Sequence, residues 1–360
     1  MTDQLQHNDT DFNKLLAVLE QTHLELQTQA ARSVDIALVV RNWLFGWYIV
    51  EFENGGAQRE ELYGKNLIGR ISDELRQRGL RGISSTNLKQ CRTFYLAYKE
   101  IGQTLSGESF SKTLPEQLTA YFKLGWSHYV TLLTVSHTEE RRFYEIEAAQ
   151  NSWSFRELKR QIAASLYERL SLSRNKEEIR QLATQGLVVE KVSDIIKNPY
   201  VLEFLNLSEQ HAYSEHELET EIIDKLEHFL LELGKGFLFE ARQKRFTFDD
   251  DHFYVDLVFY NRLLHCYVLI DLKRDKLTHQ DLGQMQMYVN YFDRYVKTDE
   301  EAPTVGILLC HRKSDALVEL TLPEDSNIYA SKYQLYLPSK EELKAQIEKS
   351  LLDHEEAAGR

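Results

Sequence analysis

Residues Phe253–Lys276 read FYVDLVFYNRLLHCYVLIDLKRDK, two apolar runs interrupted by a few charged residues. These runs predict two β-strands joined by a turn centred on Asn261-Arg262. Asp256 interrupts the first strand, and Asp271 and Lys273 close the second. Because side chains alternate along a strand, Asp271 and Lys273 are expected on the same face of the sheet.

The register of this hairpin decides whether the two aspartates meet. An antiparallel pairing about the predicted turn sets Asp256 opposite Tyr267, on the face of Asp271 but offset along the strands. A bulge or a divergence of the strands is therefore expected to close the gap. Two carboxylates and an ammonium group are costly to bury on a largely apolar sheet, and a bound divalent cation would offset that cost. A structural ion pair is the alternative.

An aspartate followed on the next strand by acid-x-Lys resembles the PD-(D/E)xK nuclease superfamily. Here the pattern stands as Asp256 and Asp271-Leu272-Lys273. Asp271 occupies the acidic position where glutamate is commoner, which shortens this ligand by one methylene. The resemblance implies an α/β core built around a mixed sheet.

Composition narrows the class of protein. The chain has 360 residues, 42% hydrophobic and 28% charged, which is typical of soluble globular proteins and leaves room for two or three domains. No apolar run reaches the length of a membrane span, and the polar start MTDQLQHNDTDF is unlike a signal peptide. The three cysteines match neither a disulfide framework nor a zinc site. We expect a cytoplasmic protein that is not embedded in a membrane.

Charge is unevenly distributed along the chain. The formal net charge is −13, yet Glu61–Lys99 holds eight Lys/Arg and three Asp/Glu, a local balance of +5. A basic segment on an acidic protein is the distribution expected if one module contacts phosphate.

This basic segment predicts two short helices across the turn Gly79–Gly82, the second running over Thr86–Glu100 with Ser84 or Ser85 as its cap. The arrangement resembles a helix-turn-helix. Its second helix presents side chains able to reach base edges or phosphates: Asn87, Lys89, Gln90 and Arg92. The pattern alone favours the alternative, a helical hairpin with a solvated polar face.

Longer phrases in the middle of the chain carry a more specific resemblance. They are WSHY at Trp126–Tyr129, RRFYEIEA at Arg141–Ala148, WSFRELKRQI at Trp153–Ile162 and NPYVLEFLNL at Asn198–Leu207. They resemble the bacterial YhcG-like family, over about residues 12–350. Members of that family join a helical N-terminal domain to a PD-(D/E)xK nuclease domain. The domains are therefore expected at 11–205, all-α, and at 214–352, the nuclease domain.

The order of elements in the last third agrees with this resemblance. A helix over Ser214–Leu233 is followed by three strands, and then by a helix at about Thr278–Lys297, a strand at Thr304–Cys310 and a strand at Ile328–Leu337. The order α-β-β-β-α-β is that of the superfamily core, an α/β sandwich around a mixed sheet. A last helix is expected at Lys340–Leu352.

The resemblance also implies further site residues. The first helix of the core often adds a carboxylate, for which Glu221 is the candidate and Glu217 the alternative. Gln284 and Tyr288 lie four residues apart on the next helix and resemble a Gln-x-x-x-Tyr element, with Gln286 and Asn290 as a competing pair. Arg242, in the run Arg242–Arg245, either contacts the phosphodiester or points outward.

These residues predict divalent-metal-dependent hydrolysis of DNA phosphodiesters, and the resemblance suggests a role in restriction or mobile-element defence. Mg²⁺ or Mn²⁺ prefers oxygen ligands, which here are Asp256, Asp271, the Leu272 carbonyl and Glu221. Lys273 would orient the attacking water and offset developing charge. Two alternatives stay open: an inactive nuclease fold that serves as a DNA-binding scaffold, and a regulator acting through the helix-turn-helix-like segment. The sequence also leaves open whether the chain forms a homo-oligomer.

Overall fold

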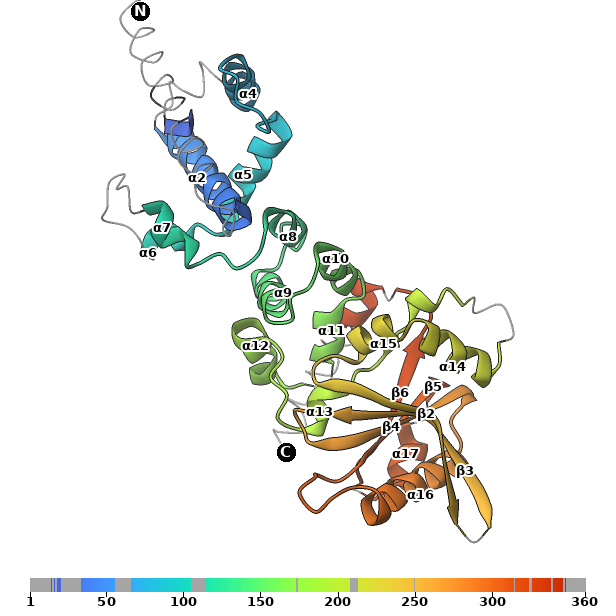
Figure 1. Ribbon diagram of the computed structural model, residues 1–360. Helices are drawn as coiled ribbons and strands as arrows, with labels where there is room; N and C mark the ends of the chain where they lie inside the picture. The colour runs from blue at the N-terminus through green and yellow to red at the C-terminus, as the bar shows by residue number, and fades with distance from the viewer. Residues whose placement is uncertain are drawn as a thin grey trace, which may run out of the picture. The chain divides into compact units, whose positions relative to one another are not determined.

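The computed structural model describes residues 14, 16, 18–20, 34–55, 66–104, 114–172, 174–207, 213–248, 250–313, 315–323, 326–337, 339–345 and 347. The chain divides into two compact units, Met1–Lys159 and Arg160–Arg360 (Figure 1). The predicted last helix, Lys340–Leu352, is helical where the structure describes it, at 340–345 and 347, and its remaining residues lie outside the described part of the chain. The domain boundaries 11–205 and 214–352 stay a prediction.

The described elements of the first unit are all helices. They are α2 (Val34–Asn54), α4 (Leu67–Gln77), α5 (Ser85–Ala97), α6 (Glu100–Thr104), α7 (Leu114–Thr119), α8 (Trp126–Leu132) and α9 (Thr138–Gln150), and α10 (Phe155–Ala163) crosses the unit boundary. Helices α2 and α5 pack so closely at Gly46 that a Cβ there would collide with the carbonyl oxygen of Cys91. The ring of Phe94 packs against those of Trp126 and Tyr129 at centroid distances of 5.4 and 5.0 Å. These aromatic side chains therefore build the core of the unit.

The second unit holds the sheet. Its elements are α11 (Leu166–Ser171), α12 (Lys176–Gln185), α13 (Val192–Ile195), β1 (Tyr200–Val201), η2 (Glu203–Leu205), α14 (Glu215–Asp224), α15 (Leu226–Leu233), β2 (Phe237–Phe248), β3 (Asp251–Asn261), β4 (Cys266–Lys276), α16 (His279–Tyr295), β5 (Val305–Arg312), α17 (Asp315–Thr321) and β6 (Ile328–Gln334). The helix predicted over Ser214–Leu233 is interrupted at Lys225, whose φ of −118° and ψ of 33° end α14 before α15 begins.

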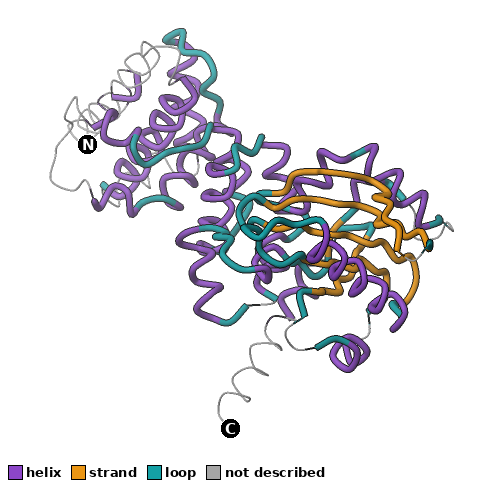
Figure 2. Tube along the Cα trace, turned by 60° about the horizontal axis from the view of Figure 1, so that its bottom comes forward, coloured by secondary structure: helices purple, strands orange, loops and turns teal. Residues whose placement is uncertain are grey.

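The six strands form one mixed sheet in the order β1-β6-β5-β4-β3-β2. Strands β4, β5, β6 and β1 run parallel, whereas β2–β3 and β3–β4 are antiparallel pairs. Helices lie on both sides of the sheet (Figure 2). This confirms the predicted α/β class with a mixed sheet at the C-terminal end of the chain.

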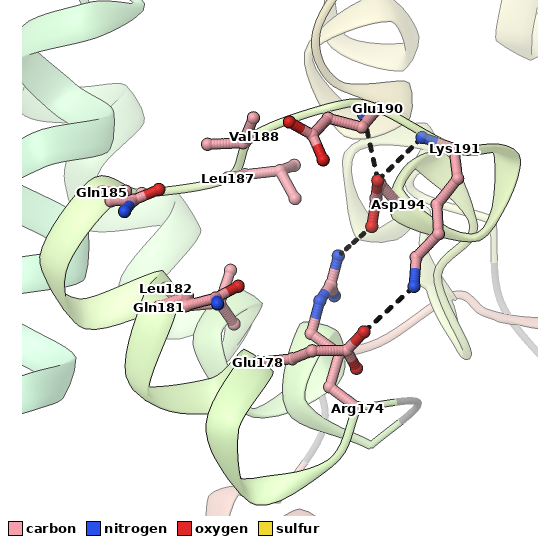
Figure 3. A pocket seen from close by; sticks show the side chains of 11 residues that line it. Arg174, Glu178, Gln181, Leu182, Gln185, Leu187, Val188, Glu190, Lys191 and Asp194 are labelled. Atoms are coloured by element: carbon pink, nitrogen blue, oxygen red, sulfur yellow. Dashed lines mark hydrogen bonds and ion pairs between the residues drawn. The ribbon is translucent and has the colours of Figure 1, made fainter.

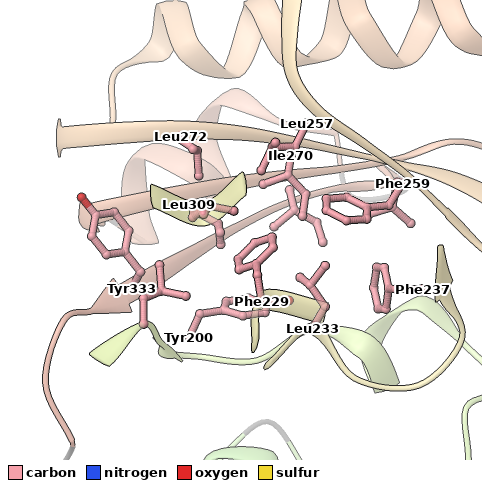
Figure 4. Packing of buried hydrophobic residues seen from close by; sticks show 14 of the residues in the cluster. Tyr200, Phe229, Leu233, Phe237, Leu257, Phe259, Ile270, Leu272, Leu309 and Tyr333 are labelled. Carbon is pink, nitrogen blue, oxygen red and sulfur yellow. The ribbon is translucent and has the colours of Figure 1, made fainter. Parts of the chain in front are cut away.

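Each face of the sheet has its own hydrophobic core. On one face Phe229 and Leu233 of α15 pack toward Phe259, Ile270 and Leu309 of the strands (Figure 4). On the other face Met285, Tyr288 and Val289 of α16 pack against Leu269 of β4 and Leu308 of β5. Burial on both faces fixes the register, because a slip of one residue would exchange the two sets.

The register predicted for the β3–β4 hairpin is wrong. Tyr260 pairs with Tyr267, and Leu257 pairs with Ile270, around a turn at residues 262–265. The turn forms there because Asn261, fully buried, accepts hydrogen bonds from the backbone N–H groups of Leu263 and Leu264 at 3.0 and 3.2 Å. One further step of this register sets Asp256 opposite Asp271, so the hairpin needs no bulge.

The bulge lies one strand away, in β2. There the register against β3 shifts between Phe239 and Ala241. Gln243, a few residues along, has a positive φ of 47°. This irregular backbone turns the side chains of β2 relative to those of β3 and matters for the site described next.

Candidate active site

Asp256 and Asp271 form a carboxylate pair on adjacent strands. Asp271 is 3% exposed and Asp256 is half-buried. Burial raises the pKa of Asp256 to about 7, with further contributions from the charge of Asp271 and from a hydrogen bond between the two carboxyl groups. Burial also raises the pKa of Asp271, although Lys273 opposes the shift.

Lys273 is the cation of the cluster. Its Nζ lies 2.8 Å from Oδ2 of Asp271 and 3.9 Å from both Glu215 Oε2 and Asp281 Oδ1. Burial opposes the charged form of Lys273, but the charge of Asp271 outweighs it and the pKa is raised. One ammonium group thus faces an excess of carboxylates, which is the charge balance of a site that receives a cation.

The structure brings Glu219 of α14, rather than Glu221, to this cluster. Glu219 is 3% exposed, and Gln243 Nε2 donates to its Oε2 at 2.6 Å and to Asp256 Oδ1 at 3.0 Å. Glu221 instead pairs with Lys225 at 2.8 Å on the outer side of the helix. The alternative candidate, Glu217, caps its own helix by accepting from the Ser214 N–H at 2.6 Å. Helical spacing could have identified Glu219 from the sequence. It lies beside Leu218 and three residues before Ile222, the two buried apolar positions of α14.

Arg242 does not lie free to contact a phosphodiester. Its guanidinium pairs with Glu219 and donates to Thr220 Oγ1 at 3.0 Å. Arg242 therefore fixes the buried carboxylate of Glu219, which in turn holds Gln243 against Asp256.

Gln284 and Tyr288 lie beside the carboxylate pair. Gln284 Nε2 donates to the Tyr288 hydroxyl, and Tyr288 is 1% exposed. Burial raises the pKa of Tyr288 to about 12, and the charge of Asp271 adds to the shift. The competing pair, Gln286 and Asn290, interacts at 3.3 Å on the exposed side of α16. The Gln-x-x-x-Tyr pair is thus the one that faces the site.

The two short helices predicted around Gly79–Gly82 are present as α4 and α5, and their resemblance to a helix-turn-helix stays a prediction. Lys89 is exposed, whereas Asn87 and Gln90 are half-buried. Arg92 Nε forms an ion pair with Glu53 Oε2 at 2.8 Å, which occupies its guanidinium. Only Lys89 of these four is both exposed and able to bring a positive charge to a phosphate.

A pocket of about 320 Å³ lies elsewhere in the second unit (Figure 3). Four of its charged side chains are paired with one another, Arg174 with Asp194 at 3.3 Å and Lys191 with Glu178 at 2.9 Å. It contains none of the predicted site residues.

The oxygen atoms of the carboxylate pair fit a divalent cation. Within the described part of the chain, no group of three or more His, Cys, Asp or Glu side chains is arranged to hold a metal. Mg²⁺ needs less than that, because it is usually held by one or two carboxylates and keeps several waters. Asp256, Asp271 and the Leu272 carbonyl are an oxygen-only set of this kind. A cation there would offset the burial that raises the pKa of both aspartates, and the repulsion that the charge of Asp271 adds at Asp256.

A mixed sheet with an aspartate on one strand and Asp-x-Lys on the next defines the PD-(D/E)xK class of nuclease fold. Residues 193–348 match the YhcG PDDEXK nuclease domain, and residues 19–169 match the DUF1016 N-terminal domain. The Escherichia coli (strain K12) protein named "Putative nuclease YhcG" is 38% identical over 334 residues, which cover 88% of each chain. The chain belongs to the YhcG family.

Solved structures align with a smaller part of the chain. A repair endonuclease from Pyrococcus abyssi is 20% identical over 36% of this chain and 50% of that one, with a TM-score of 0.24. An EndoMS–dsDNA complex is 20% identical over 37% and 49%, with a TM-score of 0.25. Among the described residues, no helix is long and apolar enough to cross a membrane.

Proposed function

We propose that this chain is a divalent-metal-dependent nuclease that hydrolyses phosphodiester bonds in DNA at Asp256, Asp271 and Lys273. The observation that carries the proposal is the carboxylate pair itself. Two acidic groups stand on adjacent strands with raised pKa values, and Lys273 Nζ lies 2.8 Å from one of them. Such shifts cluster at functional sites, because burying like charges together is costly for stability alone.

When Mg²⁺ or Mn²⁺ is bound, it polarises the phosphoryl oxygen and acidifies a water. Asp256 and Asp271 would hold the ion together with the Leu272 carbonyl. Lys273, charged and half-buried, would hold the attacking water and stabilise the negative charge that develops on the phosphoryl group.

The surrounding residues would position this machinery. Gln243 bridges Glu219 and Asp256, so it would fix the orientation of the Asp256 carboxylate. Tyr288, held by Gln284, would close the side of the site toward α16. In this proposal Glu219 supports the ligands from behind, in place of the role expected for Glu221.

The proposal includes Lys89 as a phosphate contact in the first unit, supported by its exposure on α5. The proposal also includes a role in restriction or in defence against mobile elements. The protein would act in the cytoplasm, where cellular DNA lies.

The test is a cleavage panel with the full chain on linear, circular, branched and single-stranded DNA and on RNA, with Mg²⁺, Mn²⁺ or EDTA. We expect DNA cleavage with either metal and none with EDTA, and no cleavage by Asp271→Asn. Binding of DNA without cleavage under any metal would identify a scaffold instead. Cleavage of RNA alone would overturn the DNA assignment.

A further inference from the structure

A groove of about 370 Å³ lies between α16 and the end of β2, where the β2–β3 hairpin projects past the helix (Figure 1). It is separate from the carboxylate pair. Its lining combines aromatic side chains, amides and one arginine: Phe246, Phe248, Gly283, Gln286, Met287, Asn290, Tyr291, Arg294 and Tyr295.

Aromatic side chains make up much of the groove's lining. The rings of Phe246 and Tyr291 stack at 4.1 Å with an interplanar angle of 20°, and Tyr295 continues the row 5.3 Å from Tyr291. Tyr295 is 64% exposed and Phe248 is 53% exposed. A row of exposed rings at the mouth of a groove marks a binding surface, and such rings are the platform on which unpaired bases stack.

The polar lining distinguishes a nucleobase from an apolar peptide. Gln286 and Asn290 offer amide donors and acceptors of the kind that pair with base edges. Among the residues that the structure describes, their side chains bond only to each other, at 3.3 Å. Arg294 is exposed and forms no hydrogen bond or ion pair with another described residue. None of the lining residues is acidic, in a chain with a net charge of −13. Asp250 and Asp251, at the hairpin turn, would repel phosphates. The phosphates of a bound strand are therefore expected on the side of Arg294.

The groove adjoins the proposed active site through Phe246. Phe246 packs edge-on against Tyr288 at 5.5 Å and face-to-face against Tyr291, so one ring contacts both places. Tyr288 and Tyr295 are seven residues apart on α16, which a helical rise converts to roughly 10 Å. A strand with its phosphodiester at the carboxylate pair would carry a neighbouring base over the groove.

We infer that this groove binds an unpaired nucleobase of the substrate, next to the phosphodiester that is cut. The substrate is then a nucleic acid with a single-stranded segment at the site, because a paired base within a duplex has both faces covered. This inference rests on the proposed function and names its substrate class.

The test measures binding apart from cleavage. An oligonucleotide carrying one 2-aminopurine is titrated with the full chain in EDTA, as a single strand, as a duplex with a single-stranded flap and as a blunt duplex. Stacking of the probe on tyrosine quenches its fluorescence.

Gly283→Leu fills the groove, since a Cβ at Gly283 meets no atom within 4 Å and leucine is a good helix former. Tyr295→Ala removes the most exposed ring of the row. Tyr254→Ala is the matched control, because Tyr254 is 45% exposed and lies outside the groove.

We expect quenching with the single strand and the flap but not with the blunt duplex. Gly283→Leu and Tyr295→Ala should weaken binding about tenfold, as expected for the loss of one stacked base, while Tyr254→Ala binds as wild type. Equal binding by all four proteins would overturn the inference. So would unchanged nucleic-acid binding with a loss of self-association in Gly283→Leu, which would assign the groove to a second copy of the chain. Neither result depends on whether the protein cleaves, so the proposed function can fail separately.

Discussion

The backbone N–H of Leu272 donates a 2.9 Å hydrogen bond to Oδ2 of Asp256. This bond links the carboxylate of β3 to the backbone of β4 between Asp271 and Lys273. Hydrogen bonding from an N–H group favours the charged carboxylate, whereas burial and the neighbouring Asp271 disfavour it. The result is an acidic group whose proton can be displaced near neutral pH.

The raised pKa of Asp256 predicts that the metal-free protein becomes less stable to unfolding as pH rises. In the folded state the Asp256 carboxyl has a pKa of about 7, whereas in the unfolded state its pKa is about 4. The contribution of this group to the free energy of unfolding therefore falls as pH rises from about 4 to 7. With EDTA present, Asp256→Asn should raise Tm relative to wild type more at pH 8 than at pH 5.

Thermal melts of the two proteins at both pH values check this, and saturating Mg²⁺ should stabilise wild type most at pH 8, where both carboxylates are free to bind it. A difference in Tm that is the same at pH 5 and pH 8 would contradict the assignment of the shift to Asp256.

Exchanging the two candidate glutamates on α14 separates their roles. Glu219→Gln removes the charge opposite Arg242 and loosens Gln243 from Asp256, so the cleavage rate should fall about 10- to 100-fold. Glu221→Gln breaks only the surface pair with Lys225 and should leave the rate within about twofold of wild type. Cleavage rates at saturating metal, with Tm as the check on folding, decide between them. The reverse order of effects would restore Glu221 as the site residue.

Some of the site was predictable from the sequence because it depends on local periodicity. Alternation along β4 places Asp271 and Lys273 together, and the four-residue spacing on α16 places Gln284 beside Tyr288. Both follow from one element at a time.

The register and the choice of glutamate depend on contacts between elements. The hairpin turn lies beyond Asn261 because that side chain is buried and accepts two backbone N–H groups, which the residue pattern does not distinguish from a turn at Asn261 itself. Glu219 is selected by Arg242 and Gln243, and these reach it from a strand whose bulge and positive φ at Gln243 cannot be seen in the sequence.

A buried ion cluster is predicted to hold Arg160–Val201 against the nuclease core. Glu232 is fully buried; its Oε1 lies 2.5 Å from Arg169 Nη1 and accepts from the Val201 N–H at 2.9 Å. Burial opposes its charge, but Arg169, Lys197 and Arg160 outweigh it and lower its pKa to about 2. Its contribution to stability is therefore present above about pH 4 and lost as pH falls toward 2.

Glu232→Ala removes the carboxylate partner of the fully buried Arg169 and should lower the free energy of unfolding by about 3–5 kcal/mol. Glu203→Ala removes the partly exposed partner of Arg160, which keeps its contact with Glu232, and should cost less. Urea unfolding at pH 7 measures both. Equal losses in the two variants would show that the cluster contributes no more than the partly exposed pair.

Lys89 is the residue of α5 through which the first unit is predicted to contact phosphate. Lys89→Glu should weaken DNA binding. It should also reduce the slope of log K against the logarithm of the salt concentration by about 1 or more, because fewer counterions are released. Lys99→Glu, an exposed lysine beyond the end of α5, is the control. An unchanged salt slope in folded Lys89→Glu would make this segment an ordinary helical hairpin.

Metal-dependent cleavage by Lys273, Asp256 and Asp271 can be tested by single-turnover cleavage of DNA at saturating Mg²⁺. Lys273→Ala and Asp271→Asn are compared with Lys191→Ala, an exposed lysine of the same unit that pairs with Glu178. Thermal melts and DNA binding on the same preparations confirm that each variant is folded. We expect the cleavage rate to fall by about two to three orders of magnitude in the first two variants and to stay at the wild-type value in the third. Wild-type cleavage rates in folded Lys273→Ala and Asp271→Asn would contradict the assignment of catalysis to this site.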